Sequence, residues 1–272
     1  MAISEGIYKI INNNNPILAT AIHAGHEARP EVKELFNLSS DERLREEDPF
    51  TDKWTTVSDT RILGHHSRFE LDLNRSRDKA VYQKPEDAWC LQVWKDGIPE
   101  EQVQHSLKHY DQFYAEIKQL LEGLVQEHGC FVVLDLHSYN HRRNGADAPP
   151  ESAEENPEIN IGTGNINMEL WGPLVQRFVH DLRSYNYNGR HLDVRENVKF
   201  NGGHFMRWIN ENFHNTGCAI AIEFKKFFMD EWTGEPDQDQ IIEIEKLLKS
   251  TLPGLMEERK KICGEPNRLR FI

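Results

Sequence analysis

The stretch Phe131-Val-Val-Leu-Asp-Leu-His137-Ser138 limits the fold of this chain more than any other segment. Its apolar residues predict a buried strand, and the strand carries an acid, a histidine and a hydroxyl at its C-terminal end. In open α/β sheets, ligands bind at that end of the strands. A histidine held there by a rigid strand is suited to metal ligation or to general-base catalysis. Taken alone, the segment fits equally well a histidine that only terminates a strand.

A second apolar run, residues 17–22, leads into the turn His23-Ala-Gly-His-Glu27. Imidazole and carboxylate groups are the ligands of catalytic zinc sites, where three protein groups leave a fourth position for water. The turn is not an HExxH zinc helix, because Pro30 stands where the second histidine would be needed. Such paired histidines are often incidental, but together with His137 from another strand end they predict a metal site.

The segment 65–75 adds positively charged groups. Apolar residues alternate with polar ones over positions 69–73, which predicts a half-buried strand. Arg68 and Arg75 flank this run, and Asn74 adds an amide. Because guanidinium groups hold carboxylates by paired hydrogen bonds, arginines beside a metal predict a small-molecule substrate that bears a carboxylate. The alternative is surface ion pairing in a chain with many acids.

A fourth segment, Cys218-Ala-Ile-Ala-Ile-Glu223, places a carboxylate within an apolar strand-like run. A buried carboxylate is costly unless it is paired or used. Partial desolvation would raise its pKa toward the range of a general base. The rival interpretation is a structural ion pair with Lys225 or Lys226.

Helical patterns separate these strand-like segments. Apolar residues recur every three or four positions over 103–124, 170–182 and 241–255, and we expect Pro253 to end the third helix. The alternation predicts an α/β fold, with a mostly parallel, mixed sheet that helices cover on both faces, in a single domain over residues 1–272. The polar segment 141–157 holds three prolines and is expected to form a rim or lid over the site, or else a solvated insertion.

Charge and composition narrow the classes of partner. The net charge of −13 argues against nucleic acid or an anionic membrane as partner. No apolar stretch approaches the length that spans a membrane, and the N-terminal residues lack the pattern of a signal peptide. The four cysteines lie far apart, so we expect buried free thiols rather than disulfides. These features predict a cytoplasmic protein.

Together the segments resemble the N-formylglutamate amidohydrolase family, part of the wider zinc carboxypeptidase and aspartoacylase group of metal-dependent amide hydrolases. The resemblance runs from about residue 15 to residue 235. Six short motifs carry it in the family's order: His23-Ala-Gly25, Ser67 to Arg75, Asp135 to Ser138, Gly162-Thr163, Gly202 to Arg207, and Glu223.

The resemblance implies one catalytic zinc ion, with His23 and His137 as two of its ligands. The family's third ligand is the second Asp of an Asp-Thr-Asp string, and the closest stretch here is Glu46-Glu47-Asp48. We therefore expect Asp48 to be the third ligand. Glu27 is the alternative, because aspartoacylase-like enzymes take their carboxylate from the histidine turn.

The resemblance also implies the remaining roles. Glu223 looks like the general base that activates water, and Arg68, Asn74 and Arg75 look like the group that holds the substrate's carboxylate and carbonyl. Arg207 would add a further positive charge. The implied fold is zinc-carboxypeptidase-like (phosphorylase/hydrolase-like).

The implied reaction is hydrolysis of an N-acyl amino acid, such as N-formylglutamate, in amino-acid catabolism of the kind that degrades histidine. The alternatives are a related zinc deacylase or carboxypeptidase that accepts another acyl group, and an inactive binding protein on the same fold.

Overall fold

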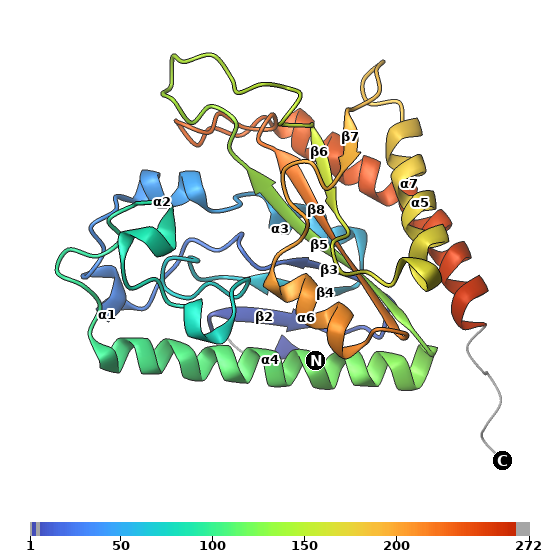
Figure 1. The fold of residues 1–272 in the computed structure, drawn as a ribbon, viewed down its shortest axis with the longest axis horizontal. Helices are drawn as coiled ribbons and strands as arrows, with labels where there is room; N and C mark the ends of the chain where they lie inside the picture. Colours follow the sequence, from blue (N-terminus) through green and yellow to red (C-terminus); the bar gives the residue numbers. More distant parts are fainter. Residues whose placement is uncertain (1, 4–5, 265–272) are drawn as a thin grey trace.

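The computed structural model describes residues 2–3 and 6–264, and eight strands of this part form one mixed sheet (Figure 1). In spatial order the strands run β1-β2-β4-β3-β5-β8-β6-β7. Their bounds are β1 Ala2–Ile3, β2 Tyr8–Ile11, β3 Ile17–Ala21, β4 Thr60–Gly64, β5 Phe131–Tyr139, β6 Ile159–Gly162, β7 Val194–Glu196 and β8 Gly217–Lys225.

The four central strands, β4, β3, β5 and β8, are parallel to one another, whereas β2 and β6 join them in antiparallel fashion. All nine residues of β5 are buried, as the near-continuous apolar run predicts for a strand covered on both faces. Because parallel strands end at the same edge, the residues after β3 and at the end of β5 come together there. In the register of β5 and β8, His137 lies directly opposite Glu223.

Helices cover both faces of the sheet (Figure 1). On one face α4 packs against α6, where the Tyr114 ring contacts that of Trp208 at 4.9 Å. On the other face α3 meets α7, since the Trp54 indole donates to the carbonyl of Ile241 (3.1 Å), and α5 packs along α7. The helices are α1 Pro30–Lys33, α2 Ser40–Glu46, α3 Thr51–Trp54, α4 Glu100–His128, α5 Met168–Ser184, α6 His204–Asn212 and α7 Gln238–Cys263.

The predicted α/β class and the three predicted long helices are confirmed, but Pro253 does not end the third. Helix α7 continues past this proline to Cys263. Its buried stripe also continues, through Leu255 to Arg259, whose guanidinium donates to the carbonyl of Cys130 (3.0 Å). Tertiary packing therefore outweighs the backbone hydrogen bond that a proline removes.

The strand predicted over residues 69–73 is wrong. This segment is a series of turns with no strand partner, in which Glu70 donates its backbone N–H to Ser67 (3.0 Å) and Arg75 to Asp72 (3.2 Å). The alternation has another cause. The apolar residues face the core, and Glu70 and Asp72 are also fully buried, where both carboxylates are bound by charged side chains.

The prediction that all four cysteines are free thiols is also wrong. Cys130 and Cys263 form a disulfide across 133 positions of sequence, because the end of α7 packs beside the start of β5. Cys90 and Cys218 are free. Among the described residues, no helix combines the length and the apolar character needed to cross a membrane. The single domain over residues 1–272 stays a prediction.

Candidate metal centre and substrate cavity

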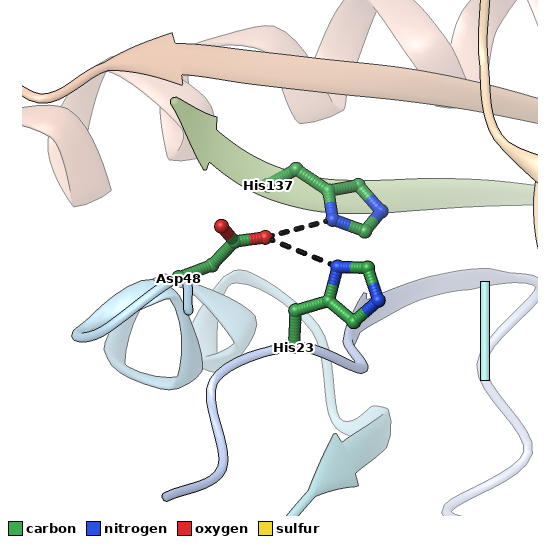
Figure 2. A group of neighbouring side chains, drawn as sticks. All are labelled: His23, Asp48 and His137. Carbon is green, nitrogen blue, oxygen red and sulfur yellow. Dashed lines mark hydrogen bonds and ion pairs between the residues drawn. The ribbon is translucent and has the colours of Figure 1, made fainter. Parts of the chain in front are cut away.

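Three residues from three separate segments meet at the C-terminal edge of the parallel strands (Figure 2). His23 follows β3, His137 lies near the end of β5, and Asp48 follows α2. The Oδ2 atom of Asp48 lies 2.9 Å from Nδ1 of His137 and 3.5 Å from Nδ1 of His23. All three side chains are buried. The structure therefore brings together the two predicted histidines and the predicted aspartate.

The alternative carboxylate, Glu27, does not join this group. Its side chain is 68% exposed and pairs with Lys33 on the surface at 2.6 Å. The turn that carries His23 instead packs against the backbone that follows β4. A Cβ at Gly25 would lie 2.2 Å from the carbonyl carbon of His65, so this close approach requires glycine.

Two further carboxylates hold the outer edges of the imidazole rings. Asp72 Oδ1 lies 2.7 Å from Nε2 of His23, and Asp135 Oδ2 lies 3.1 Å from Nε2 of His137. Sequence reasoning missed both roles. For Asp135 a signal existed, since residues two apart on a strand share a face. Asp72 had no such signal, because its partner is distant in sequence.

This arrangement fits a divalent cation. Nε2 of His23 is hydrogen-bonded to Asp72 and Nε2 of His137 is ion-paired with Asp135, so both rings direct Nδ1 inward beside Asp48, which is the arrangement of carboxylate–histidine–metal sites. The candidate ligand atoms of His23, Asp48 and His137 all lie within 4.8 Å of one another. Two imidazoles and one carboxylate form the ligand set of many catalytic zinc sites.

The electrostatics of the site also favour a bound cation. Burial alone would lower the pKa of His137, but Asp135 and Asp48 hold it well above its usual value. Burial would raise the pKa of Asp48, but the two imidazoles hold it well below its ordinary range. A proton on His137 thus balances the neighbouring carboxylates, and a bound cation would take over that function.

Glu223 faces this group from the adjacent strand, opposite His137. Burial raises its pKa to about 7, and the nearby charges of Asp48 and Asp135 add to the effect. Among the described residues, the Glu223 carboxylate forms no hydrogen bond or ion pair. The rival ion pair is absent from this part of the chain, because the ammonium groups of Lys225 and Lys226 donate to backbone carbonyls instead.

A cavity of about 580 Å³ opens beside the candidate ligands. Its acidic lining residues are Glu46, Asp48 and Glu223. Its cationic lining residues are more numerous: Arg68, Arg75, Lys79, Arg143, Lys199, Arg207 and Lys226. Although the whole chain is strongly acidic, the cavity is therefore suited to an anionic substrate.

The predicted substrate-binding residues all line this cavity, but they differ in how many of their polar groups are already bound to other protein groups. Arg68 is already bound to Asp72 at 2.7 Å. The Asn74 amide oxygen accepts the backbone N–H of Phe205 (2.9 Å) at the start of α6. Arg75 forms only a long ion pair, with Nε 3.8 Å from Oδ2 of Asp72. Among the described residues, the guanidinium of Arg207 forms no hydrogen bond or ion pair.

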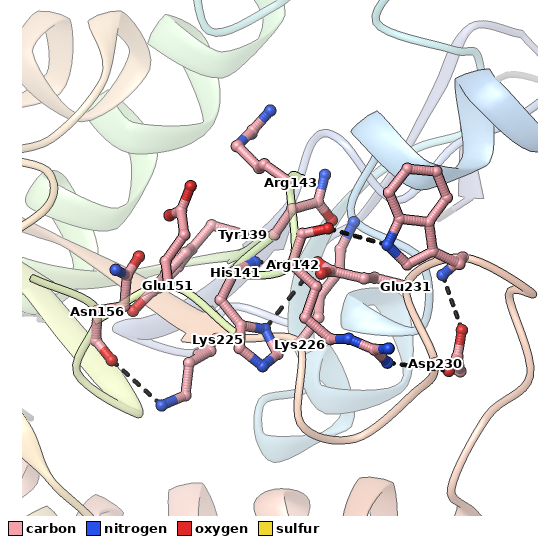
Figure 3. A network of polar contacts seen from close by, with 12 residues as sticks. Tyr139, His141, Arg142, Arg143, Glu151, Asn156, Lys225, Lys226, Asp230 and Glu231 are labelled. Atoms are coloured by element: carbon pink, nitrogen blue, oxygen red, sulfur yellow. Dashed lines mark hydrogen bonds and ion pairs between the residues drawn. The ribbon is translucent and has the colours of Figure 1, made fainter. Parts of the chain in front are cut away.

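The segment 141–157, predicted to be a rim, a lid or a solvated insertion, has no helix or strand and borders the cavity through Arg143. Polar contacts attach it to neighbouring loops (Figure 3). The backbone N–H of His141 donates to Glu231 (2.9 Å), and the pair Glu151–Lys199 lies at 3.2 Å. Sequence reasoning did not single out Arg143 or Lys199, because their place in the cavity depends on loop conformation.

Comparisons with known proteins agree with this architecture. Residues 15–229 match the sequence model of a family described as N-formylglutamate amidohydrolase. The fold is similar to the crystal structure of N-formylglutamate amidohydrolase from Ralstonia eutropha JMP134, with a TM-score of 0.68 and 16% identity over 94% of this chain and 97% of that one. A gene product of Agrobacterium tumefaciens is similar at a TM-score of 0.64 and 16% identity, over 89% and 92% of the two chains. No curated protein sequence matches the chain.

Proposed function

The chain belongs to the N-formylglutamate amidohydrolase family, and from this premise we propose that it uses one divalent metal ion to hydrolyse an N-formyl amino acid such as N-formylglutamate. The observation that carries the proposal is the meeting of His23, Asp48 and His137 in a cavity that Glu223 also lines. We assign the first three residues as metal ligands and Glu223 as the general base.

The ligand set favours zinc, which when bound polarises a carbonyl group and lowers the pKa of water. Glu223 would accept a proton from the attacking water at its carboxylate. It would then return this proton to the amide nitrogen as the C–N bond breaks. From N-formylglutamate and water the products are formate and glutamate.

Substrate orientation would come from the cationic lining. Arg75 and Arg207 are the guanidinium groups least engaged by the protein, so we assign them to the substrate's carboxylate. Arg68 would act partly through Asp72, which it holds against His23. Asn74 would face the substrate and would also connect α6 to the site. Its amide oxygen accepts the backbone N–H of Phe205, and its amide nitrogen lies 3.5 Å from His137 Nε2.

A substrate panel tests the proposal. Zinc-loaded protein would be assayed with the N-formyl, N-acetyl and N-succinyl forms of glutamate, and with an N-formyl amino acid that has an apolar side chain. We expect the highest kcat/KM for N-formylglutamate. Preference for a larger acyl group would instead support a related deacylase. Absence of turnover on every compound, with zinc bound, would overturn the assignment as an N-acyl amino acid hydrolase.

A further inference from the structure

We propose that Lys226 is a positioning residue, which holds the turn Glu46–Asp48 so that the Asp48 carboxylate faces His23 and His137. The inference rests on the proposed function in taking Asp48 as a metal ligand. It adds a residue that acts on the metal site without touching the metal.

The contacts of Lys226 carry the inference. Lys226 directly follows β8, and its backbone N–H donates to the carbonyl of Tyr139 (3.0 Å) in β5, so the sheet fixes its Cα. Lys226 is buried, with 2% of its surface exposed. Its ammonium group donates to the carbonyl of Arg45 (2.6 Å) and to that of Glu47 (2.8 Å). These two carbonyls lie just before Asp48 in the chain.

The same turn is held from its other side. The Glu47 side chain is fully buried, and its carboxylate contacts His26 Nδ1 (2.5 Å) and accepts a hydrogen bond from the Ser67 hydroxyl. The backbone N–H of Asp48 donates to the carbonyl of His23 (3.0 Å). Side chain and backbone of the residue before Asp48 are thus both restrained.

A lysine suits this position for a physical reason. Helix α2 ends at Glu46, and the last carbonyls of a helix have no partner within the helix. An ammonium group satisfies such carbonyls and interacts favourably with the helix dipole. Because it binds the carbonyls on both sides of Glu46, Lys226 restrains the path by which the chain leaves the helix and enters Asp48. Figure 3 shows Lys226 beside Lys225 and Glu231 at this end of the sheet.

A purely electrostatic role would have the opposite effect on metal binding. A positive charge near a cation repels it, so loss of the Lys226 ammonium would tighten metal binding if charge alone mattered. If Lys226 positions Asp48, its loss must weaken metal binding. Removal of groups that orient metal ligands costs ~10- to 100-fold in metal affinity.

The test compares the zinc Kd of the wild type, Lys226→Met and Lys225→Met, each measured by competition with a chelator. Lys225 is the matched control, because it is the preceding residue and donates to the carbonyl of Asn156 (3.1 Å), outside the turn. We expect the Kd of Lys226→Met to rise ~10- to 100-fold and that of Lys225→Met to stay near the wild-type value. An unchanged or lower Kd in Lys226→Met overturns the inference.

Thermal unfolding of the metal-free proteins separates positioning from general stability. A purely structural lysine would lower the Tm of Lys226→Met and leave its Kd unchanged. If the methionine variant does not fold, Lys226→Gln replaces it. The shorter amide keeps an NH2 donor group but loses the charge and the reach of the ammonium, so the opposed expectations for Kd still hold. A wild type that binds no zinc would overturn the proposed function itself, which is distinguishable from a tight-binding Lys226→Met.

Discussion

At the scale of single residues, the two central histidines are used in the same way. Each presents Nδ1 to Asp48 and Nε2 to a second carboxylate, Asp72 or Asp135. The histidines could be predicted from the sequence because each ends an apolar run. Their outer partners could not be predicted as a set, because a carboxylate's role depends on the ring that it faces after folding.

Replacement of Glu223 by glutamine tests its role as general base. The amide keeps the shape of the side chain but cannot accept the water proton, so we expect kcat to fall by ~100- to 10,000-fold while the zinc content is unchanged. The base works only when ionised, so wild-type kcat/KM should rise with pH through the pKa of Glu223. That pKa is about 7 without metal, and a bound cation would lower it. Near-normal turnover in zinc-loaded Glu223→Gln would refute the assignment.

The stability of the metal-free protein gives a second test of Glu223. The folded state raises the pKa of this carboxyl from 4.5 to about 7, so it holds the proton more tightly than the unfolded chain does. Stability from this group is therefore lost as the pH rises from 4.5 to about 7. We expect Glu223→Gln to stabilise the metal-free protein at pH 8 by about 3 kcal/mol, since one pKa unit is worth about 1.4 kcal/mol and the pKa rises from 4.5 to about 7. Urea unfolding at pH 4 and pH 8 measures this, and a destabilised variant at pH 8 would argue for a structural ion pair.

The role of Arg75 is tested by a conservative change. Lysine keeps the charge but not the planar pair of donors, so Arg75→Lys should lower kcat/KM by roughly 10- to 100-fold on the free acid, the value of a hydrogen bond to a charged group. The methyl esters of N-formylglutamate serve as the control. The ester that masks the recognised carboxylate should be a poor substrate for the wild type and should lose little more in the variant. Equal losses on the acid and on both esters would show that Arg75 is structural.

At the scale of elements, strands and helices that bury an apolar face could be predicted from the sequence, whereas segments whose conformation depends on a specific distant contact could not. The central strands and long helices follow from apolar periodicity. Residues 69–73 also alternate but form turns, in which the buried carboxylates of Glu70 and Asp72 bind arginine side chains. Pro253 lies inside α7 because the packing on both sides of it favours a continuous helix. The turn after β3 depends on a contact that periodicity cannot reveal, the backbone of His65 against Gly25.

Two glycine substitutions form a matched pair at this scale. In Gly25→Ala the new methyl group would meet the His65 backbone at 2.2 Å, so we expect a loss of about 1–3 kcal/mol and weaker zinc binding, as His23 shifts. Gly123 is exposed in α4 with no atom within 4 Å of an added Cβ, so Gly123→Ala should stabilise by about 0.5–1 kcal/mol. Denaturant unfolding of both variants checks the signs. An unchanged free energy of unfolding in Gly25→Ala would show that the turn can accommodate a methyl group, which would contradict the close approach of the His65 backbone.

At the scale of the whole molecule, the charge of the cavity is opposite in sign to the net charge of the chain. The chain carries a net charge of −13, yet seven of the ten charged side chains that line the cavity are cationic, His residues not counted. Net charge could be read from composition, but the gathering of arginines and lysines from distant segments could not, because it follows from loop conformations. The disulfide between Cys130 and Cys263 was missed for another reason: 133 positions separate the two cysteines in sequence, and only the packing of the end of α7 beside the start of β5 brings them together.

The metal content of three proteins tests the central claim most directly. Wild type, Asp48→Asn and Glu27→Gln would each be loaded with zinc, desalted and measured by elemental analysis. Asp48 lies between the two histidines, whereas Glu27 pairs with Lys33 on the surface. We predict one zinc ion per chain in the wild type and in Glu27→Gln, and a substoichiometric amount in Asp48→Asn. Equal zinc in all three proteins, or loss of zinc in Glu27→Gln alone, would contradict a metal centre formed by His23, Asp48 and His137.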